Sequence, residues 1–306
     1  MKVLVLGSKG FIGSNILMQA NRYRVDVVGL SRIDCDFLET RKLAAIISRE
    51  SPDYVINATG LVAGIQGNID KPFDLLNTNA QLTLSIANSC LIAGVEKYIS
   101  YSAACIYPGN LLESLNPSDI WSDKPEATSL SYATSKIMSL QLSESINSQY
   151  GLRWKTIIPS NLYGFKENLS DIDNSAHVLE SLIAKTLYAK RNHKLSVEVW
   201  GDGSPLRTFL NIKDLASATF HILGISEQLP SIINVNGGEE VSIKSLAESI
   251  VHFTGFTGDL WFNSTKPNGS ARKNLDDSIL RSTGWAPETQ FLSELRALIF
   301  QVEASI

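Results

Sequence analysis

The sequence predicts an α/β fold, with a doubly wound parallel sheet followed by a smaller, mixed α/β domain. Short apolar runs alternate with helical patterns as far as residue 159, which is the order in which a parallel sheet is built. The chain has 306 residues, which is long enough for two domains. We expect the first domain in residues 1–164 and the second mainly in residues 165–306, with some later segments returning to the first sheet.

The N-terminal segment carries the first detailed signal. Residues 2–6 form an apolar run typical of a buried parallel strand, and residues 14–20 have helical spacing. Between them, Gly7, Gly10 and Gly13 form the pattern G-x-x-G-x-x-G. Gly7 permits a tight turn, Gly10 lets a phosphate approach, and Gly13 lets the helix pack closely on the strand. The helix N-terminus suits a pyrophosphate, although glycines at this spacing also occur in ordinary tight turns.

The segments that follow continue the alternation. We expect strands at residues 25–30, 53–57, 97–102 and 154–159, and helices at 41–50 and 73–94. The small residues Ala58, Thr59 and Gly60 follow the third strand, at the edge of the sheet where ligands bind in such folds. Residues 61–68 are small and apolar, and we expect a loop there that lines a substrate cleft. Together with the glycine loop, these features predict a Rossmann-type dinucleotide-binding domain.

The residues after the second strand indicate which dinucleotide binds. An acidic side chain at this position accepts a hydrogen bond from the ribose 2′-hydroxyl of NAD, whereas a basic one accommodates the 2′-phosphate of NADP. Arg32 stands there and Lys9 lies in the glycine loop, so we favour NADP(H) and keep NAD as the alternative. Asp34 and Asp36 lie nearby and are alternative contacts for the ribose or the adenine.

Tyr132 and Lys136 stand four residues apart in a helical pattern, and therefore on one face of a helix. An ammonium beside a phenol favours the phenolate, so we expect Lys136 to lower the pKa of Tyr132. A phenol tuned in this way protonates a carbonyl oxygen as a hydride arrives, or removes the proton in the reverse direction. Such pairs also arise by chance on helix surfaces, but this one follows a nucleotide-binding unit, and that order indicates catalysis.

Four further segments carry a resemblance to a known family. They are Cys105-Ile-Tyr-Pro108, Pro159-Ser-Asn-Leu-Tyr-Gly164, Trp200-Gly-Asp-Gly-Ser-Pro-Leu-Arg207 and Lys266-Pro-Asn-Gly-Ser-Ala-Arg-Lys273. With the glycine loop and the Tyr/Lys pair, they resemble the GDP-L-fucose synthase family, which are extended short-chain dehydrogenase/reductases of the NAD-dependent epimerase/dehydratase superfamily. The matches run from residue 2 to about Trp285, which is almost the whole chain.

The resemblance implies a two-part reaction on a GDP-4-keto-6-deoxy sugar, with epimerisation at C3 and C5 followed by reduction of C4 by NADPH. The cysteine and histidine that move protons in the family match Cys105 and His177. Each also has a structural interpretation, Cys105 as a small buried apolar residue and His177 as a helix cap or surface residue. We expect cofactor contacts from Gly7, Lys9, Gly10, Phe11, Ile12, Gly13, Arg32, Asp36, Ala58, Thr59, Gly60, Tyr132, Lys136, Pro159, Asn161, Leu162 and His177.

For the substrate, the resemblance points to cations for the diphosphate and a platform for the base. The expected substrate contacts are Ser102, Lys185, Trp200, Arg207 and Asn268. The family has an arginine at the position of Lys185, so a point charge replaces a two-pronged donor here. Arg207 has an alternative as an ion-pair partner of Asp214, and Trp200 has one as a core residue.

Two positions depart from the family pattern. Ala103 stands where the family has a serine that donates to the C4 oxygen, and Ser102 is one residue too early. Loss of one such donor typically lowers the rate about a hundred- to a thousandfold. Three interpretations follow from this loss. Tyr132 is sufficient if water, Thr134 or Ser102 replaces the serine as the second donor. Otherwise the enzyme acts on another 4-keto sugar that needs no such donor, or its catalytic activity is low. Asn268 replaces a usual aspartate and suggests a changed nucleotide or sugar contact.

The C-terminal part continues as mixed α/β. We expect helices at residues 177–190, 241–253 and 291–302, a helix that ends near 223 and a short one that ends near 283. We expect strands at residues 196–200, 232–236 and 259–262. Ser242 is the expected N-cap of the helix at 241–253.

The composition excludes several other classes of protein. The net charge of −4 favours neither nucleic acid nor an anionic membrane as a partner. Cys35, Cys90 and Cys105 are too few and scattered for a disulfide framework or a zinc site, so we expect no metal. No signal peptide or membrane-length apolar run is present, and we expect a cytoplasmic protein. The resemblance implies a homodimer built on the long helices near Phe73 and Tyr132.

Three other functions stay open at this point. The first is a C4 reductase that does not epimerise, or an enzyme for a related dideoxy or heptose 4-keto nucleotide-sugar. The second is a 4-epimerase or dehydratase that holds NAD tightly, which Lys9 and Arg32 argue against. The third is a non-catalytic nucleotide-binding regulator, for which Ala103 is the support in the sequence.

Overall fold

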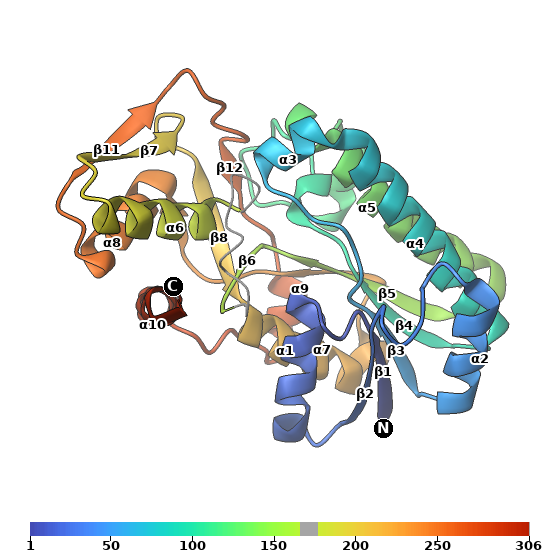
Figure 1. Ribbon diagram of the computed structural model, residues 1–306. Helices are drawn as coiled ribbons and strands as arrows, with labels where there is room; N and C mark the ends of the chain where they lie inside the picture. The colour runs from blue at the N-terminus through green and yellow to red at the C-terminus, as the bar shows by residue number, and fades with distance from the viewer. Residues whose placement is uncertain (166–176, 306) are drawn as a thin grey trace.

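The computed structural model describes residues 1–165 and 177–305, and its larger region is built on a six-stranded parallel sheet (Figure 1). In spatial order the strands are β2 (Asp26–Leu30), β1 (Lys2–Leu6), β3 (Tyr54–Asn57), β4 (Lys97–Tyr101), β5 (Arg153–Pro159) and β9 (Ile232–Val235). The chain leaves β1 for β2 on one side and returns to β3 on the other. This reversal marks the carboxyl ends of β1 and β3 as the edge where ligands bind in such sheets.

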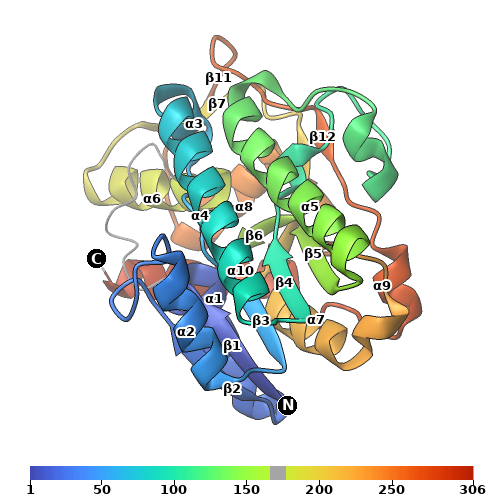
Figure 2. The same ribbon diagram turned by 90° about the vertical axis from the view of Figure 1, so that its right-hand side faces the viewer.

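Helices cover both faces of this sheet. Three lie side by side on one face, as Figure 2 shows: α2 (Thr40–Glu50), α4 (Pro72–Ile92) and α5 (Leu130–Tyr150). The other face carries α1 (Phe11–Gln19) and α7 (Ile212–Ile225). Along β1, Val3 and Val5 are buried in the layer of α1 and α7, while Leu4 and Leu6 are buried in the opposite layer. Because both faces of β1 are covered, its sequence is continuously apolar from Val3 to Leu6.

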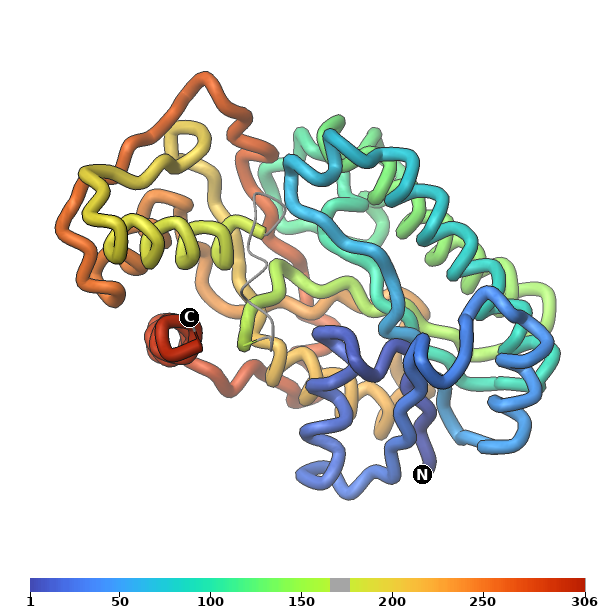
Figure 3. The backbone as a smooth tube through the Cα atoms, in the orientation of Figure 1, coloured from blue at the N-terminus to red at the C-terminus, as the bar shows by residue number. Residues whose placement is uncertain are grey.

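The smaller region contains two small sheets. In the first, β8 (Leu206–Asn211) pairs with β6 (Asn161–Tyr163), β10 (Glu240–Ser242) and β12 (Arg272–Lys273). The second consists of the parallel strands β7 (Ser196–Trp200) and β11 (Asp259–Asn263). A third apolar core lies among these strands, α6 (Val178–Arg191), α8 (Ile243–Thr254) and α10 (Phe291–Ser305). Figure 3 shows the C-terminal helix α10 in this region and the N-terminus in the larger one.

Short elements connect these parts. Within the described part of the chain, the remaining α-helices are α3 (Ile65–Asp70) and α9 (Ser278–Ser282). The 3-10 turns described there are η1 (Ala20–Tyr23), η2 (Ala104–Ile106), η3 (Pro117–Trp121), η4 (Ala127–Ser129) and η6 (Ser226–Gln228).

The α/β fold predicted from the sequence is confirmed, and the differences are one six-residue strand and several short elements. Residues 61–68, expected to be a loop, include the start of α3. The strand β8 was not predicted, because residues 209–214 were expected only to lead into a helix. The strands β6, β10 and β12 were also not predicted, because each has two or three residues and exists through its pairing with β8. Ser242 is the N-cap of α8, and its Oγ accepts a hydrogen bond from the Ser245 amide at 3.0 Å.

Some segments cross the predicted domain boundary at residues 164 and 165. α7 and β9 follow that boundary in the sequence but pack in the larger region, and β6 precedes it but pairs in the smaller one. The boundary itself stays a prediction.

Across residues 1–165 and 177–305, no helix combines the length and apolar character needed to cross a membrane. The same residues contain no group of three His, Cys, Asp or Glu side chains placed to hold a metal ion.

Candidate active site

The glycine loop joins β1 to α1 at the carboxyl edge of the sheet. Gly7 has φ +83°, and its amide donates to the Leu30 carbonyl at 2.8 Å. A Cβ atom on Gly13 would lie 2.3 Å from the carbonyl oxygen of Gly7, so glycine alone lets α1 pack at this distance. Gly10 is the exposed N-cap of α1, and the amides of the next turn have no partner within the helix. This loop fits the phosphates of a dinucleotide.

The turn at residues 58–60, after β3, lies directly against the glycine loop. A Cβ atom on Gly7 would be 2.8 Å from the Ala58 carbonyl oxygen. Gly60 has φ +154°, and a Cβ atom there would lie 3.5 Å from Lys136 Nζ. The backbone at this edge therefore connects the predicted cofactor loop with the predicted catalytic lysine.

The acidic residues near the end of β2 are engaged by their own loop. The Asp34 carboxylate accepts hydrogen bonds from the amide and Oγ of Ser31 at 2.8 and 2.6 Å, which lowers its pKa. Asp36 Oδ1 accepts from the Leu38 amide at 3.0 Å. Lys9 and Arg32 are exposed on the same edge, where a 2′-phosphate would meet them.

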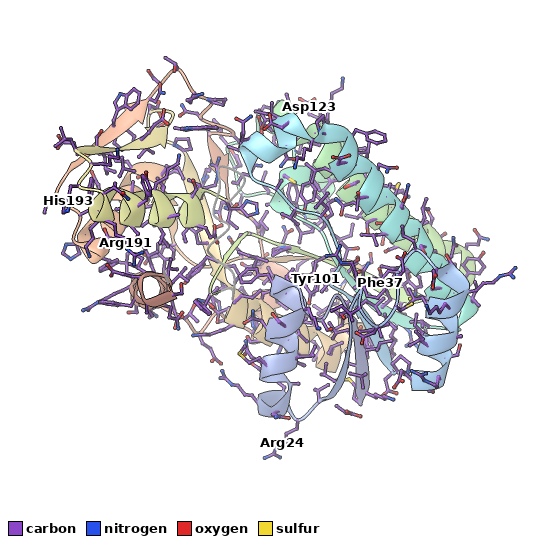
Figure 4. The ribbon with its side chains drawn as sticks, in the orientation of Figure 1. Arg24, Phe37, Tyr101, Asp123, Arg191 and His193 are labelled. Atoms are coloured by element: carbon purple, nitrogen blue, oxygen red, sulfur yellow. The ribbon has the colours of Figure 1, made fainter. Side chains whose placement is uncertain are left out.

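Tyr132 and Lys136 both lie on α5 and face the carboxyl end of β4. Lys136 Nζ donates to the Tyr101 carbonyl at 3.2 Å and lies 5.8 Å from the centroid of the Tyr132 ring. Figure 4 labels Tyr101 near the middle of the molecule. The hydroxyl of Tyr132 makes no hydrogen bond to any other described residue.

The electrostatics of this pair correct the prediction made from the sequence. The pKa of Tyr132 is raised, because burial disfavours the phenolate and the nearby Cys105 adds to the effect. Burial also lowers the pKa of Lys136, to about 8. Desolvation of both side chains outweighs the expected influence of the ammonium on the phenol. Tyr132 is therefore protonated at neutral pH, which is the form that donates a proton.

Cys105 lies at the same edge, in the turn η2 that follows β4. Its thiol is half-buried, whereas Cys35 and Cys90 are buried. Burial raises the pKa of Cys105, and the ammonium groups of Lys273 and Lys136 oppose that rise. The thiol, the phenol and the two ammonium groups thus share one site.

Lys273, on β12, was not predicted as a site residue, although it ends the segment 266–273. Burial lowers the pKa of Lys273. Cys105 raises this pKa, whereas Arg207 lowers it further. The carboxylate of Glu126 also acts on it, and this side chain is held by the Thr128 amide at 3.2 Å. A lysine on a two-residue strand has no signature of its own in the sequence, because only tertiary packing brings β12 to Cys105.

The predicted substrate residue Trp200 lies between two lysines. Lys185 Nζ is 5.6 Å and Lys266 Nζ is 5.1 Å from the centroid of its ring. Trp200 is half-buried at the end of β7, so its ring is not enclosed in the core. Lys266 was not predicted from the sequence, because it comes from a segment 66 positions away from Trp200.

Arg207 is half-buried on β8, and burial lowers its pKa. Its Nη1 donates to the Leu206 carbonyl at 2.7 Å. The alternative ion pair with Asp214 is not formed, since the Asp214 carboxylate instead accepts from the Glu288 amide at 2.9 Å and from Thr289. The guanidinium of Arg207 is therefore not committed to that carboxylate.

Asn268 has a structural partner that accounts for its departure from the family aspartate. Its Oδ1 accepts from the Asp202 amide at 2.9 Å, and its side chain also lowers the pKa of the Asp202 carboxyl after the larger effect of Ser204. A Cβ atom on Gly201 would lie 1.9 Å from the same Oδ1. An aspartate at 268 would place a second carboxylate beside Asp202, so the neutral amide suits this turn.

The candidates for replacing the missing serine are poorly placed. Ser102 is 6% exposed, and its Oγ is buried without a hydrogen-bond partner among the described residues, which closes it off from a substrate. Thr134 Oγ1 donates to the Leu130 carbonyl at 2.8 Å on the exposed side of α5. Ala103 has extended backbone and is half-buried.

The remaining predicted residues come from the start of α6, the end of β5 and the strand β6. His177 is the exposed N-cap of α6, and residues 166–176, which precede it, lie outside the described part of the chain. Pro159 is buried at the end of β5. Asn161 Nδ2 donates to the Thr208 carbonyl at 3.1 Å, and Leu162 packs against the apolar core between the large sheet and the layer of α1 and α7.

Comparison with known proteins gives one family. The family model described as "NAD dependent epimerase/dehydratase family" matches residues 3–236. The chain is 34% identical to the probable GDP-L-fucose synthase 1 of Oryza sativa subsp. japonica, over 94% of this chain and 87% of that protein. It is 30% identical to the GDP-L-colitose synthase of Yersinia pseudotuberculosis, over 94% of this chain and 92% of that protein.

Among solved structures, the chain is similar to a GDP-6-OMe-4-keto-L-xylo-heptose reductase from C. jejuni. The TM-score is 0.90 at 23% identity, and the match covers 100% of this chain and 98% of that one. At this level of identity the likeness concerns the fold.

Proposed function

This chain belongs to the NAD dependent epimerase/dehydratase family, and we propose that it is an NADPH-dependent nucleotide-sugar oxidoreductase of the GDP-L-fucose synthase group. Its substrate in this proposal is a GDP-4-keto-6-deoxy sugar, which it epimerises at C3 and C5 and reduces at C4. The observation that carries the proposal is the meeting of Tyr132, Lys136 and Cys105 at the carboxyl end of β4. The full-length match to curated GDP-sugar enzymes supports it.

The cofactor would lie along the glycine loop and the turn at residues 58–60, with Lys9 and Arg32 at the 2′-phosphate. When bound, the nicotinamide cofactor supplies the hydride for the C4 carbonyl carbon. Tyr132 gives its phenolic proton to the C4 oxygen, and its raised pKa keeps that proton available at neutral pH. Lys136 holds a positive charge beside this phenol, and its pKa of about 8 leaves it mostly charged at pH 7.

Epimerisation uses the acidity that the 4-ketone confers on neighbouring carbon atoms. One group removes the proton at C3 or C5 to form an enolate, and a second group returns a proton from the opposite face. Cys105 and His177 are the proposed pair. The ammonium groups of Lys273 and Lys136 favour the thiolate of Cys105, so it exchanges a proton more readily than burial alone would allow.

The nucleotide would bind in the smaller region. Lys185, Lys266 and Arg207 supply positive charge for a diphosphate, and Trp200 offers an aromatic face for the base. The homodimer and the cytoplasmic location predicted from the sequence belong to the same proposal.

A second candidate is a C4 reductase that does not epimerise. Burial raises the pKa of Cys105, which disfavours the thiolate, and Ala103 removes a donor at C4. Under this alternative Cys105 and His177 have no role in proton transfer.

One experiment separates the two candidates. The protein is mixed with NADPH and GDP-4-keto-6-deoxymannose in deuterated water, and NADPH absorbance is followed before deuterium is located by NMR. NADPH consumption with deuterium at C3 and C5 supports the epimerase-reductase, and consumption without deuterium supports the reductase. No turnover, with Ala103→Ser also inactive, would count against this substrate for either candidate.

A further inference from the structure

A buried asparagine on β9 joins two chain segments of the active site. Asn234 is 4% exposed, and its Oδ1 accepts a hydrogen bond from the Tyr107 hydroxyl at 2.6 Å. Its Nδ2 donates to the Leu115 carbonyl at 2.8 Å and to the Asp276 carbonyl at 3.0 Å. Both hydrogens of the amide are therefore used, and the side chain has one arrangement that satisfies its partners.

The first of these segments carries the proposed catalytic thiol. Tyr107 follows Cys105 by two residues and has a fully buried ring. The turn η2 between them is closed by a hydrogen bond from the Ile106 amide to the Ala103 carbonyl at 3.1 Å. Because this turn is short and closed, fixing the Tyr107 hydroxyl also fixes the position of Cys105.

The second segment carries Lys273, which precedes Asp276 by three residues. The amide of Asp276 donates to the Leu115 carbonyl at 3.0 Å, and the Leu115 amide donates to the Asn274 carbonyl at 2.8 Å. Asn236, two residues after Asn234, donates through Nδ2 to Asn274 Oδ1 at 2.7 Å. The end of β9 thus holds the residues that directly follow Lys273.

We propose that Asn234 is a positioning residue, which holds the Tyr107 and Asp276 segments together and so maintains the separation between the Cys105 thiol and the Lys273 ammonium. This role rests on the proposed function, because the thiol is the group that would epimerise the sugar. The charged groups acting on the thiol are Lys273 on β12, Lys136 on α5 and Glu126 before η4, and the thiol in turn acts on the Tyr132 phenol of α5. Asn234 acts on the segment that follows β12, while the pairing with β8 holds the strand itself.

The test measures how strongly Lys273 acts on the thiol, with and without Asn234. The rate of alkylation of Cys105 by iodoacetamide is recorded against pH. The reagent should react selectively with this thiol, because the side chains of Cys35 and Cys90 are only 2% and 0% exposed. In the otherwise unchanged chain, Lys273→Met should raise the pH midpoint by about one unit, since an opposite charge is lost. In the Asn234→Ala background the same change should shift the midpoint by less than half as much. A full shift in that background would overturn the proposal.

Asn147→Ala provides the matched control. Asn147 also uses both ends of its amide, donating to the Trp154 carbonyl at 2.8 Å and accepting from the Trp154 amide at 2.8 Å. It lies on α5 and does not touch the segments of Cys105 and Lys273, so the Lys273→Met shift should persist. Loss of the shift in this control would mean general loosening and would also overturn the proposal. If Asn234→Ala does not fold, Tyr107→Phe removes one hydroxyl from the same network and gives the same comparison.

The titration needs no substrate, so its outcome is independent of the sugar. A second readout uses the deuterium experiment: Asn234→Ala should slow exchange at C3 and C5 about tenfold more than it slows C4 reduction. Equal slowing of both would contradict the positioning role. If the unaltered protein shows the thiol coupling but no exchange with any sugar, the proposed epimerisation fails while the positioning role stands.

Discussion

The candidate active site presents backbone on its proposed cofactor side, whereas it presents partly buried charge on its proposed substrate side. The glycine loop and the turn at residues 58–60 form the cofactor side, and its cations, Lys9 and Arg32, are exposed. On the substrate side Lys136, Lys273 and Arg207 are half-buried, and burial lowers the pKa of all three.

This difference indicates that the partly buried cations of the proposed substrate side lower the stability of the folded chain, whereas the exposed cations of the proposed cofactor side do not. Exposed cations cost little, but a cation taken out of water without a close carboxylate destabilises the folded chain. Glu126 acts on Lys273 and Arg207 from a distance, and no ion pair within 4.0 Å joins it to either of these cations. An anionic ligand between these side chains would relieve the cost. The proposed substrate side therefore has more to gain from an anionic ligand than the exposed cations of the proposed cofactor side.

The largest effect should come from removing the proposed proton donor, Tyr132. Tyr132→Phe should lower the rate of C4 reduction about a thousandfold, because a positioned general acid contributes about 10²–10⁴. The measurement is NADPH oxidation at saturating sugar. Tyr150→Phe, at an exposed position on the same helix, is the matched control and should keep the full rate. A Tyr132→Phe enzyme with more than a tenth of the rate would remove Tyr132 from the mechanism.

The close packing of backbone on the proposed cofactor side should be disrupted by a single added methyl group. Gly13→Ala would place a Cβ atom 2.3 Å from the Gly7 carbonyl oxygen, and this overlap should cost about 1–3 kcal/mol of stability. NADPH affinity should fall with it, as measured by fluorescence titration. Gly224→Ala is the control, because nothing lies within 4 Å of the added atom and alanine favours the helix. Equal stability of the two variants would mean that the loop is not tightly packed.

The cost of buried charge can be measured at Lys136. Its pKa is about 8 in the folded chain against an ordinary 10.5, which corresponds to about 3 kcal/mol, and loss of the hydrogen bond to Tyr101 offsets about 1. Lys136→Met should therefore stabilise the free protein by about 2 kcal/mol at pH 7 while abolishing reduction. Urea unfolding without cofactor is the measurement.

The pH dependence of that gain has a definite sign. Because the folded pKa of Lys136 is depressed, the penalty is fully present below pH 8 and disappears as the pH rises toward 10.5. The advantage of Lys136→Met should shrink over this window. An advantage that is constant from pH 7 to 10 would place its origin in packing instead of charge.

The smallest effect should come from the exposed charge on the cofactor side. Arg32→Ser should reduce the preference for NADPH over NADH about tenfold, since one charge-assisted contact to a phosphate is worth about 1–2 kcal/mol. Stability should not change, because the side chain is exposed. Arg24→Ser, at the opposite end of β2 where Figure 4 shows Arg24, should leave the preference unchanged. An unaltered preference in Arg32→Ser would reopen NAD as the cofactor.

The sequence by itself determined the order of strands and helices in the sheet, the glycine loop and the Tyr132/Lys136 pair. Each of these is local: Gly7 to Gly13 span one turn, and Tyr132 and Lys136 share one helical face. The period of the apolar residues and the spacing of the motifs are set by backbone geometry, which is the same in every protein.

Tertiary structure alone decided which charges meet Cys105 and which way each pKa moves. Lys273 reaches the thiol from β12, and Lys266 reaches Trp200 from another loop, through contacts between segments distant in the sequence. The pKa of Tyr132 was predicted to fall and instead rises, because desolvation depends on everything that surrounds a side chain. Spacing along the chain determines which neighbours a residue has on its own helix. Only the packed fold determines how far its side chain is removed from water, and therefore which way its pKa moves.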